Sequence, residues 1–256
     1  MPSRKKGTLL ITALLMVAAV TATAAVLRLQ EQGKSKSDDP NGPTPVQEGV
    51  KTERQRRHGK LFPYNLRKLR ELVEAREGDG DIEVGVYGDF ARTIDPNAPK
   101  IPAVQAAVCN ADAIFVGTLK SKSSQLTADE SFIFTDYEMT VEEVVKDNPA
   151  APARVGGDLT VVGEGGAVSL NGRTVRARRD NFKIPEVGKR YLLFLRFIPE
   201  TGSYLSYPYG IFHLDGERVV AFHDEARVQL LDRGAKNLPT LLGEVRASTA
   251  AACPQK

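Results

Sequence analysis

Short apolar segments separated by turn-forming residues fill the second half of the sequence, and this pattern constrains the fold more than any other feature. Ala113–Leu119 holds mostly β-prone, buried-type side chains, which is typical of a strand with little exposed face. Tyr191–Phe197 is the most apolar segment and is expected to cross the core. The other predicted strands are Phe132–Val145, Leu159–Val162, Val168–Leu170, Thr174–Ala177, Tyr204–Ser206, Ile211–Leu214 and Arg218–Phe222. The pattern predicts a mainly β domain.

The residues between and within these segments predict how the strands connect. Asn171-Gly172 and Asp215-Gly216 are typical of tight hairpin turns. The alternation of Phe132–Val145 shifts around Thr135-Asp136, which indicates a bulge or strong bend of the kind that a small closed barrel needs. Gly163–Gly166 contains three glycines and predicts a flexible turn. A phosphate-binding loop is not expected there, because its lysine and hydroxyl are missing.

The N-terminus predicts a membrane or export signal over residues 1–28. Arg4, Lys5 and Lys6 precede the uncharged run Gly7–Leu27, whose 21 residues are enough for a helix to cross a bilayer. The positive flank is expected to stay in the cytoplasm, which places the bulk of the chain outside it. The alternative is a secreted protein whose signal peptide is cleaved after the small-x-small sequence ending at Ala24.

Residues 29–60 are polar, contain three prolines and lack apolar periodicity, so they predict an extended, disordered linker. The basic cluster Arg54, Arg56, Arg57 and His58 falls in this linker. It could contact anionic lipid or an acidic cell-wall polymer, although such clusters are more often simply solvated.

Helical patterns flank the predicted strands on both sides. Within residues 61–107, Pro63–Arg76 has leucines at helical spacing, Ile82–Tyr87 predicts a short strand, and Ile101–Val108 predicts a short helix. Apolar residues between Leu238 and Val245 predict a C-terminal helix packed on the β domain. The β domain with this helix is assigned to residues 108–247, and residues 248–256 form a loose tail.

A family resemblance supports the same architecture. Cys109-Asn110-Ala111-Asp112 before an apolar strand, with a second long strand ending Val141-Glu142-Glu143-Val144-Val145-Lys146, resembles tissue inhibitor of metalloproteinase and netrin-like modules. Pro185–Leu195 is similar to a later barrel strand of bacterial proteins with that architecture. The resemblance spans Val108–Phe222 and implies an OB-like five-stranded barrel.

The chain has two cysteines, Cys109 and Cys253, and neither belongs to a C-x-x-C motif. In an oxidising compartment they could form one long-range disulfide; otherwise both are free thiols. In the inhibitors an N-terminal cysteine with a free amine chelates the protease zinc. Cys109 lies deep in the chain and no Cys-x-Cys start is present, so the resemblance implies at most a structural disulfide position here.

Two sets of side chains are candidates for binding. Arg173, Arg176, Arg178 and Arg179 form the densest basic patch of the predicted domain and could hold an anionic ligand, or could be a solvated hairpin edge. His213 and His223 could meet across a hairpin and, with Asp224 or Glu225, bind a cation or form a hydrolase site. No H-E-x-x-H or G-x-S-x-G motif is present, so no catalytic, cofactor-binding or metal-binding residue is assigned.

These features together predict a membrane-tethered, extracytoplasmic binding module rather than an enzyme, with a protein or cell-envelope partner and no cofactor. Net charge is only +3, from 35 basic and 32 acidic side chains, which gives no reason to expect nucleic acid as a partner. Two alternatives remain, a metalloprotease inhibitor-like protein and a hydrolase with a site near His213 and His223.

Overall fold

The computed structural model describes residues 39–45, 51–64, 66–78, 80–86, 102–179, 183–222, 237–251 and 253, and all of these except Asp39 belong to the compact unit Pro40–Lys256. No helix within these described ranges has the length and apolar character needed to cross a membrane. The predicted leader Gly7–Leu27 lies outside the described residues.

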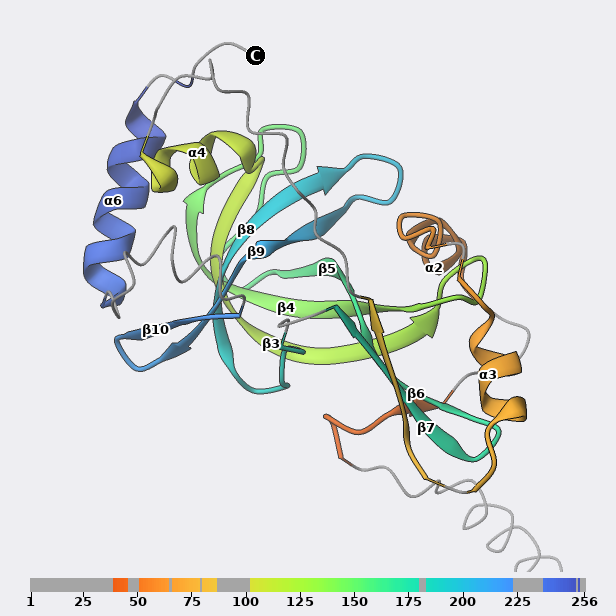
Figure 1. The fold of residues 1–256 in the computed structure, drawn as a ribbon. Helices are drawn as coiled ribbons and strands as arrows, with labels where there is room; N and C mark the ends of the chain where they lie inside the picture. Colours follow the sequence, from red (N-terminus) through yellow and green to blue (C-terminus); the bar gives the residue numbers. More distant parts are fainter. Residues whose placement is uncertain are drawn as a thin grey trace, which may run out of the picture. The chain divides into compact units, whose positions relative to one another are not determined.

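Five strands pair into a closed ring, and Figure 1 shows them at the centre of the structure. They are β3 (Ala113–Leu126), β4 (Ile133–Lys146), β5 (Asp158–Glu164), β8 (Arg190–Ile198) and β9 (Ser203–Asp215). Around the ring, β3 pairs with β4, β4 with β5, β5 with β9, β9 with β8 and β8 again with β3. All these pairs are antiparallel except β5–β9, which is parallel. The short strand β10 (Arg218–Ala221) adds to β9 through the predicted Asp215-Gly216 hairpin.

Both faces of the most apolar strands are covered, which explains why the sequence shows no clear alternation there. On β3, Phe115 faces the cluster enclosed by the ring, while Ile114 and Val116 face a second cluster with helices α4 (Ala103–Asn110) and α6 (Leu238–Ala250). Strand β8 divides its side chains between the same two clusters. The predictions of a doubly covered strand at Ala113–Leu119, of a helix after Pro102 and of a C-terminal helix packed on the sheet are therefore confirmed.

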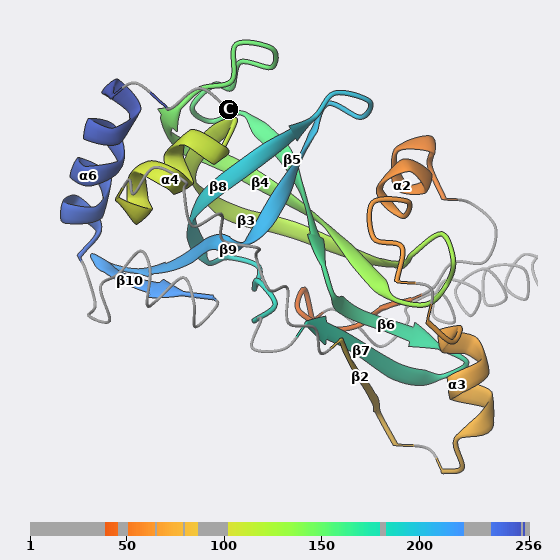
Figure 2. The ribbon, with the colours of Figure 1, turned by 45° about the horizontal axis from the view of Figure 1, so that its top comes forward.

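A second, four-stranded sheet extends from the end of β5. Strands β6 (Gly166–Leu170) and β7 (Arg173–Arg179) form the predicted hairpin, with positive φ angles of 51° and 76° at Asn171 and Gly172. The outer strands β1 (Thr44–Pro45) and β2 (Ile82–Val86) come from earlier in the chain, and both pair in parallel. Figure 2 shows helix α3 (Leu69–Ala75) beside this sheet. Its buried residues Leu69 and Val73 belong to the same apolar cluster as Val168 and Val175 of the sheet.

Two predictions for local segments were wrong. The helix expected over Pro63–Arg76 is limited to α3. Gly163–Gly166 is a packed corner and not a flexible turn, since only Gly165 separates β5 from β6. A Cβ on Gly166 would lie 2.3 Å from Thr135 Oγ1, so this corner accepts only glycine.

The bulge expected at Thr135-Asp136 is also absent. These residues pair in regular register with Ser124 and Ser123, and the register shifts of the β3–β4 ladder lie elsewhere, on Ile114–Ser121 of β3. The polar pair interrupts an apolar run because both residues have buried partners. Thr135 Oγ1 donates to the Gly165 carbonyl at 2.6 Å, and the partner of Asp136 comes from helix α2.

Helix α2 (Glu53–His58) lies in the segment that we assigned to a disordered linker. It begins with a capping box, in which the Thr52 hydroxyl accepts from the Gln55 backbone while the Gln55 side chain accepts from the Thr52 backbone. Arg56 and Arg57 both contact Glu53 on the exposed side of the helix. Residues 51–60 are ordered because polar contacts, which apolar periodicity cannot reveal, attach them to the ring.

A disulfide joins Cys109, in the last turn of α4, to Cys253 beyond the end of α6, with Cα atoms 5.6 Å apart. Lys146 closes the same end of α4, because its ammonium donates to the Val108 and Ala111 carbonyls at 2.8 and 2.5 Å. Burial lowers the pKa of Lys146. Helix α6 continues through Ala250, three residues into the segment that was assigned to a loose tail at Ser248.

Candidate functional site

The arginines of the predicted basic patch do not form one free cationic surface. Arg173 donates to the backbone carbonyls of Val73, Arg76 and Gly80 at 2.8–3.3 Å, and so it ties the C-terminal end of α3 to the β6–β7 hairpin. Arg176 and Arg178 lie on the other face of β7. The side chain of Arg179 is outside the described set.

Two acidic residues, one just before β2 and one on it, lie near the positive charges of these two arginines. Arg176 lies 3.9 Å from Asp81, just before β2, and Arg178 lies 3.6 Å from Glu83 on it. With Arg173 engaged by carbonyls, the patch is a structural seam between β7, β2 and α3. These contacts favour a structural role for Arg173, Arg176 and Arg178 over the predicted anionic-ligand site.

Replacing Arg173 with alanine is expected to lower the free energy of unfolding by about 1–2 kcal/mol, because carbonyls at the end of α3 lose a charged donor. The matched variants Arg176→Ala and Arg178→Ala are expected to leave stability unchanged, because exposed ion pairs contribute little. Urea unfolding of the three variants measures the difference. Equal losses in all three would contradict the role given to Arg173.

The two histidines of the predicted cation or hydrolase site are not brought together in the part of the chain that the structure describes. His213 lies on β9 against Tyr191, with ring centroids 5.7 Å apart, and His223 falls outside the described residues with Asp224 and Glu225. His213 lines a small cleft of about 200 Å³ beside Lys189. Within the described ranges, no three His, Cys, Asp or Glu side chains gather as metal ligands would.

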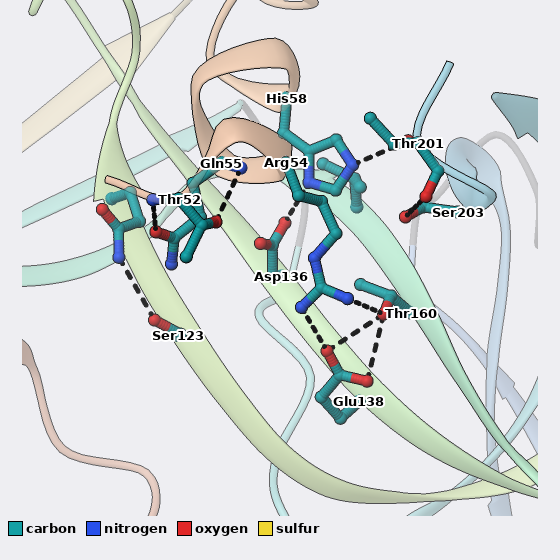
Figure 3. A network of polar contacts seen from close by, with 12 residues as sticks. Thr52, Arg54, Gln55, His58, Ser123, Asp136, Glu138, Thr160, Thr201 and Ser203 are labelled. Atoms are coloured by element: carbon teal, nitrogen blue, oxygen red, sulfur yellow. Dashed lines mark hydrogen bonds and ion pairs between the residues drawn. The ribbon is translucent and has the colours of Figure 1, made fainter. Parts of the chain in front are cut away.

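His58, which the sequence placed in a linker, is the most deeply buried polar residue of α2. Its side chain is 0% exposed, its Nδ1 donates to Asp136 Oδ1 of β4 at 2.8 Å, and its Nε2 lies 3.0 Å from Thr201 Oγ1 in the turn between β8 and β9. Figure 3 shows the imidazole between these two partners. The edge of the ring contacts Phe134, with centroids 6.5 Å apart. Helix α2 is thereby fixed to the outer face of β4.

The Asp136 carboxylate, the His58 imidazole and the Thr201 hydroxyl are hydrogen-bonded in the same order as the catalytic triad of Ser-His-Asp hydrolases. Two observations favour a structural role here instead. The imidazole is fully enclosed, and the two clefts that we describe are lined by neither His58 nor Thr201. The hydrogen bonds of His58 connect α2, β4 and the β8–β9 turn, which are three segments far apart in the sequence.

Arg54 reaches from the same helix to the next positions of the outer face. Its guanidinium donates to Glu138 Oε1 and to Thr160 Oγ1, each at 3.0 Å, and the Thr160 hydroxyl also contacts the Glu138 carboxylate (Figure 3). Three further contacts hold the ends of the segment: Lys51 Nζ donates to the Leu126 carbonyl, Arg57 donates to the Glu200 carbonyl, and the Ala128 backbone donates to Gly59. Burial lowers the pKa of Lys51.

A cleft of about 560 Å³ opens beside α2, and its lining combines Glu138 and Thr160 of the outer face with residues of the cluster that the ring encloses, Val141, Leu159 and Tyr204. Its walls come from β4, β5, the loop between them, Arg54 of α2 and the start of β9. The lining residues are Arg54, Glu138, Val141, Ala151, Pro152, Ala153, Arg154, Gly157, Asp158, Leu159, Thr160, Gly202 and Tyr204. Its volume lies within the range typical of ligand clefts.

The charges at the cleft differ in how far they are compensated. Asp158 accepts from Lys120 at 2.6 Å and from Thr140 at 2.8 Å, and these bonds hold the pKa of its carboxyl below the usual value while raising that of Lys120. Glu138 is engaged by Arg54. Arg154 is exposed, and its guanidinium makes no hydrogen bond or ion pair with another residue of the described ranges. It is the one lining cation without a counter-charge among the described residues.

Tyr204 closes the inner wall of the cleft. Its side chain is 3% exposed, its hydroxyl donates to the Ala151 carbonyl at 3.0 Å, and burial raises the pKa of the phenol. This bond and the 3.1 Å contact between Ala153 N and Asp147 Oδ1 fix the loop that carries Arg154.

No protein-family profile matches this sequence, and no curated protein is significantly similar to it. The functional conclusion therefore depends on the geometry of the chain itself. Sequence reasoning missed the cleft because segments more than a hundred residues apart form it. The one signal that could have located α2 is the Thr52-x-x-Gln55 capping box.

Proposed function

We propose that the chain is a non-enzymatic, membrane-tethered binding module that faces away from the cytoplasm and takes a protein or cell-envelope ligand in the cleft beside α2. In this proposal the N-terminal run Gly7–Leu27 anchors the chain in the membrane or exports it. The proposal includes no nucleic-acid ligand, because a net charge of +3 from 35 basic and 32 acidic side chains gives no reason to expect one.

The ring in this proposal is an OB-like five-stranded barrel of the kind that the family resemblance implies. Numbered from β3, its strands follow the order 1-2-3-5-4 with a parallel contact between the third and fifth, which supports this assignment. The β6–β7 hairpin lies between the third and fourth strands, and α4 and α6 flank the ring.

The position of the cleft is the observation that carries the proposal. OB barrels bind ligands on the face of their second and third strands and on the adjoining loops. The equivalent strands here are β4 and β5, and they supply Glu138, Val141, Asp158, Leu159 and Thr160 to the cleft.

The disulfide supports the extracytoplasmic part of the proposal. Disulfides persist in oxidising compartments and are rare in the cytosol of most organisms. Cys109 is committed to Cys253, so the cysteine that carries the resemblance to the inhibitors has a structural partner rather than a free thiol. Export through the N-terminal run and an oxidising destination are consistent with each other.

Site-specific photo-crosslinking in the native envelope tests the proposal. The full chain carries benzoylphenylalanine either at Ala153, inside the cleft, or at Glu217, in the exposed turn between β9 and β10. We expect a discrete adduct from position 153 and none from position 217. Equal adducts from both positions, or none from either, would overturn the assignment of the cleft as the binding site.

A further inference from the structure

We infer that the ligand of the cleft is a short acidic peptide segment of a partner protein, with a carboxylate held by Arg154. This inference rests on the proposed function, because it names the chemistry of the ligand for the same cleft.

The pairing of the charges favours an anion at one lining cation. Arg54 is paired with Glu138, and Asp158 is paired with Lys120 from outside the lining, which leaves one positive charge of the lining without an ion-pair partner among the described residues. That charge is on Arg154, which is exposed at the cleft and lacks a partner within the described residues. A guanidinium with its donors unused is suited to a carboxylate, which accepts two parallel hydrogen bonds.

The walls of the cleft favour a peptide as the carrier of that carboxylate. Small apolar side chains line the loop side as Ala151, Pro152 and Ala153. Val155 follows Arg154 in the chain and lies outside the cleft lining, and it is 68% exposed, so it offers further apolar surface beside the cleft. An acidic side chain followed by small aliphatic ones would satisfy the charge and cover these surfaces together.

Other anionic ligands fit less well. Saccharides and single-stranded nucleic acids are commonly held by exposed aromatic rings. Among the described residues, the only aromatic one that lines the cleft is Tyr204, which is 3% exposed. A volume of about 560 Å³ matches a short segment and not the surface of a folded domain. The fixed loop around Arg154 keeps the site formed before binding.

Fluorescence anisotropy with the full chain in detergent micelles tests the inference. The probes are a labelled hexapeptide of alternating alanine and glutamate, its lysine counterpart and labelled hexagalacturonate. We expect the glutamate peptide alone to bind, and Arg154→Glu to weaken its affinity at least tenfold because attraction becomes repulsion. The matched variant Arg218→Glu makes the same charge change on β10, away from the cleft lining, and is expected to alter the affinity less than twofold.

The outcomes separate the two proposals. Absence of peptide binding, or binding that Arg154→Glu leaves unchanged, overturns the inference, while the crosslink from position 153 would still support the cleft as the binding site. Binding of hexagalacturonate in place of the peptide overturns the inference in favour of an acidic saccharide. Tight peptide binding that is lost in Arg154→Glu and retained in Arg218→Glu supports it.

Discussion

Replacing both Cys109 and Cys253 with serine is expected to lower the free energy of unfolding by about 4–5 kcal/mol. The bond closes a loop between residues 144 positions apart, and cross-linking a loop of that length removes much of the conformational freedom of the unfolded chain. The loss is expected in full because the bond joins two elements, α4 and the end of α6, that cover one face of the ring.

Chemical denaturation in the presence and absence of dithiothreitol measures this effect. The natural chain should lose the same free energy when it is reduced, and the double serine variant should not respond to the reductant. A reductant-insensitive natural chain, or a double variant as stable as the oxidised protein, would contradict the expected contribution of the disulfide.

The His58→Ala variant is expected to be destabilised by about 3–5 kcal/mol. The substitution leaves Asp136, which is 3% exposed, without the donor to its Oδ1 atom, and removing one partner of a buried pair is costly in this range. The Oδ2 atom of Asp136 already lacks a hydrogen-bond partner within the described structure, so no second donor compensates. Arg56→Ala, on the exposed side of the same helix, is the matched control and is expected to leave stability unchanged.

A double-mutant cycle separates the His58–Asp136 pair from general packing. The loss in His58→Ala combined with Asp136→Ala should be clearly smaller than the sum of the two single losses, because both residues act in one interaction. Urea unfolding followed by circular dichroism gives the three values. Additive losses would show that the pair does not couple α2 to β4.

Local sequence signals predicted the elements that are stabilised by turn residues or by burial of apolar side chains. The Asn171-Gly172 and Asp215-Gly216 turns, the doubly covered strand at Ala113–Leu119 and the helix that contains Leu241 and Leu242 follow from turn chemistry and from apolar patterns. These signals are strong because burial on a sheet or helix face leaves a periodic trace in the sequence.

Polar interactions between residues far apart in the chain produce no periodic pattern in the sequence, and the predictions that failed concern residues with such interactions. His58 looked solvated because its neighbours are charged, yet its partner Asp136 lies 78 residues away. The arginines of β7 looked like a ligand site because the carbonyls that bind Arg173 belong to a segment about a hundred residues earlier. The pairing of Cys109 with Cys253 stayed open for the same reason, since a sequence contains no Cα separations.

The strands that precede the ring in the chain have a practical meaning for anyone who wants to isolate the folded unit. Because β1 and β2 flank β6 and β7, an expression fragment that starts at the apparent domain boundary near Val108 would strip both outer strands from that sheet. Its unpaired backbone would then be free to recruit other copies and aggregate. A fragment that begins at Pro40 keeps the sheet intact, together with the helix that supplies Arg54.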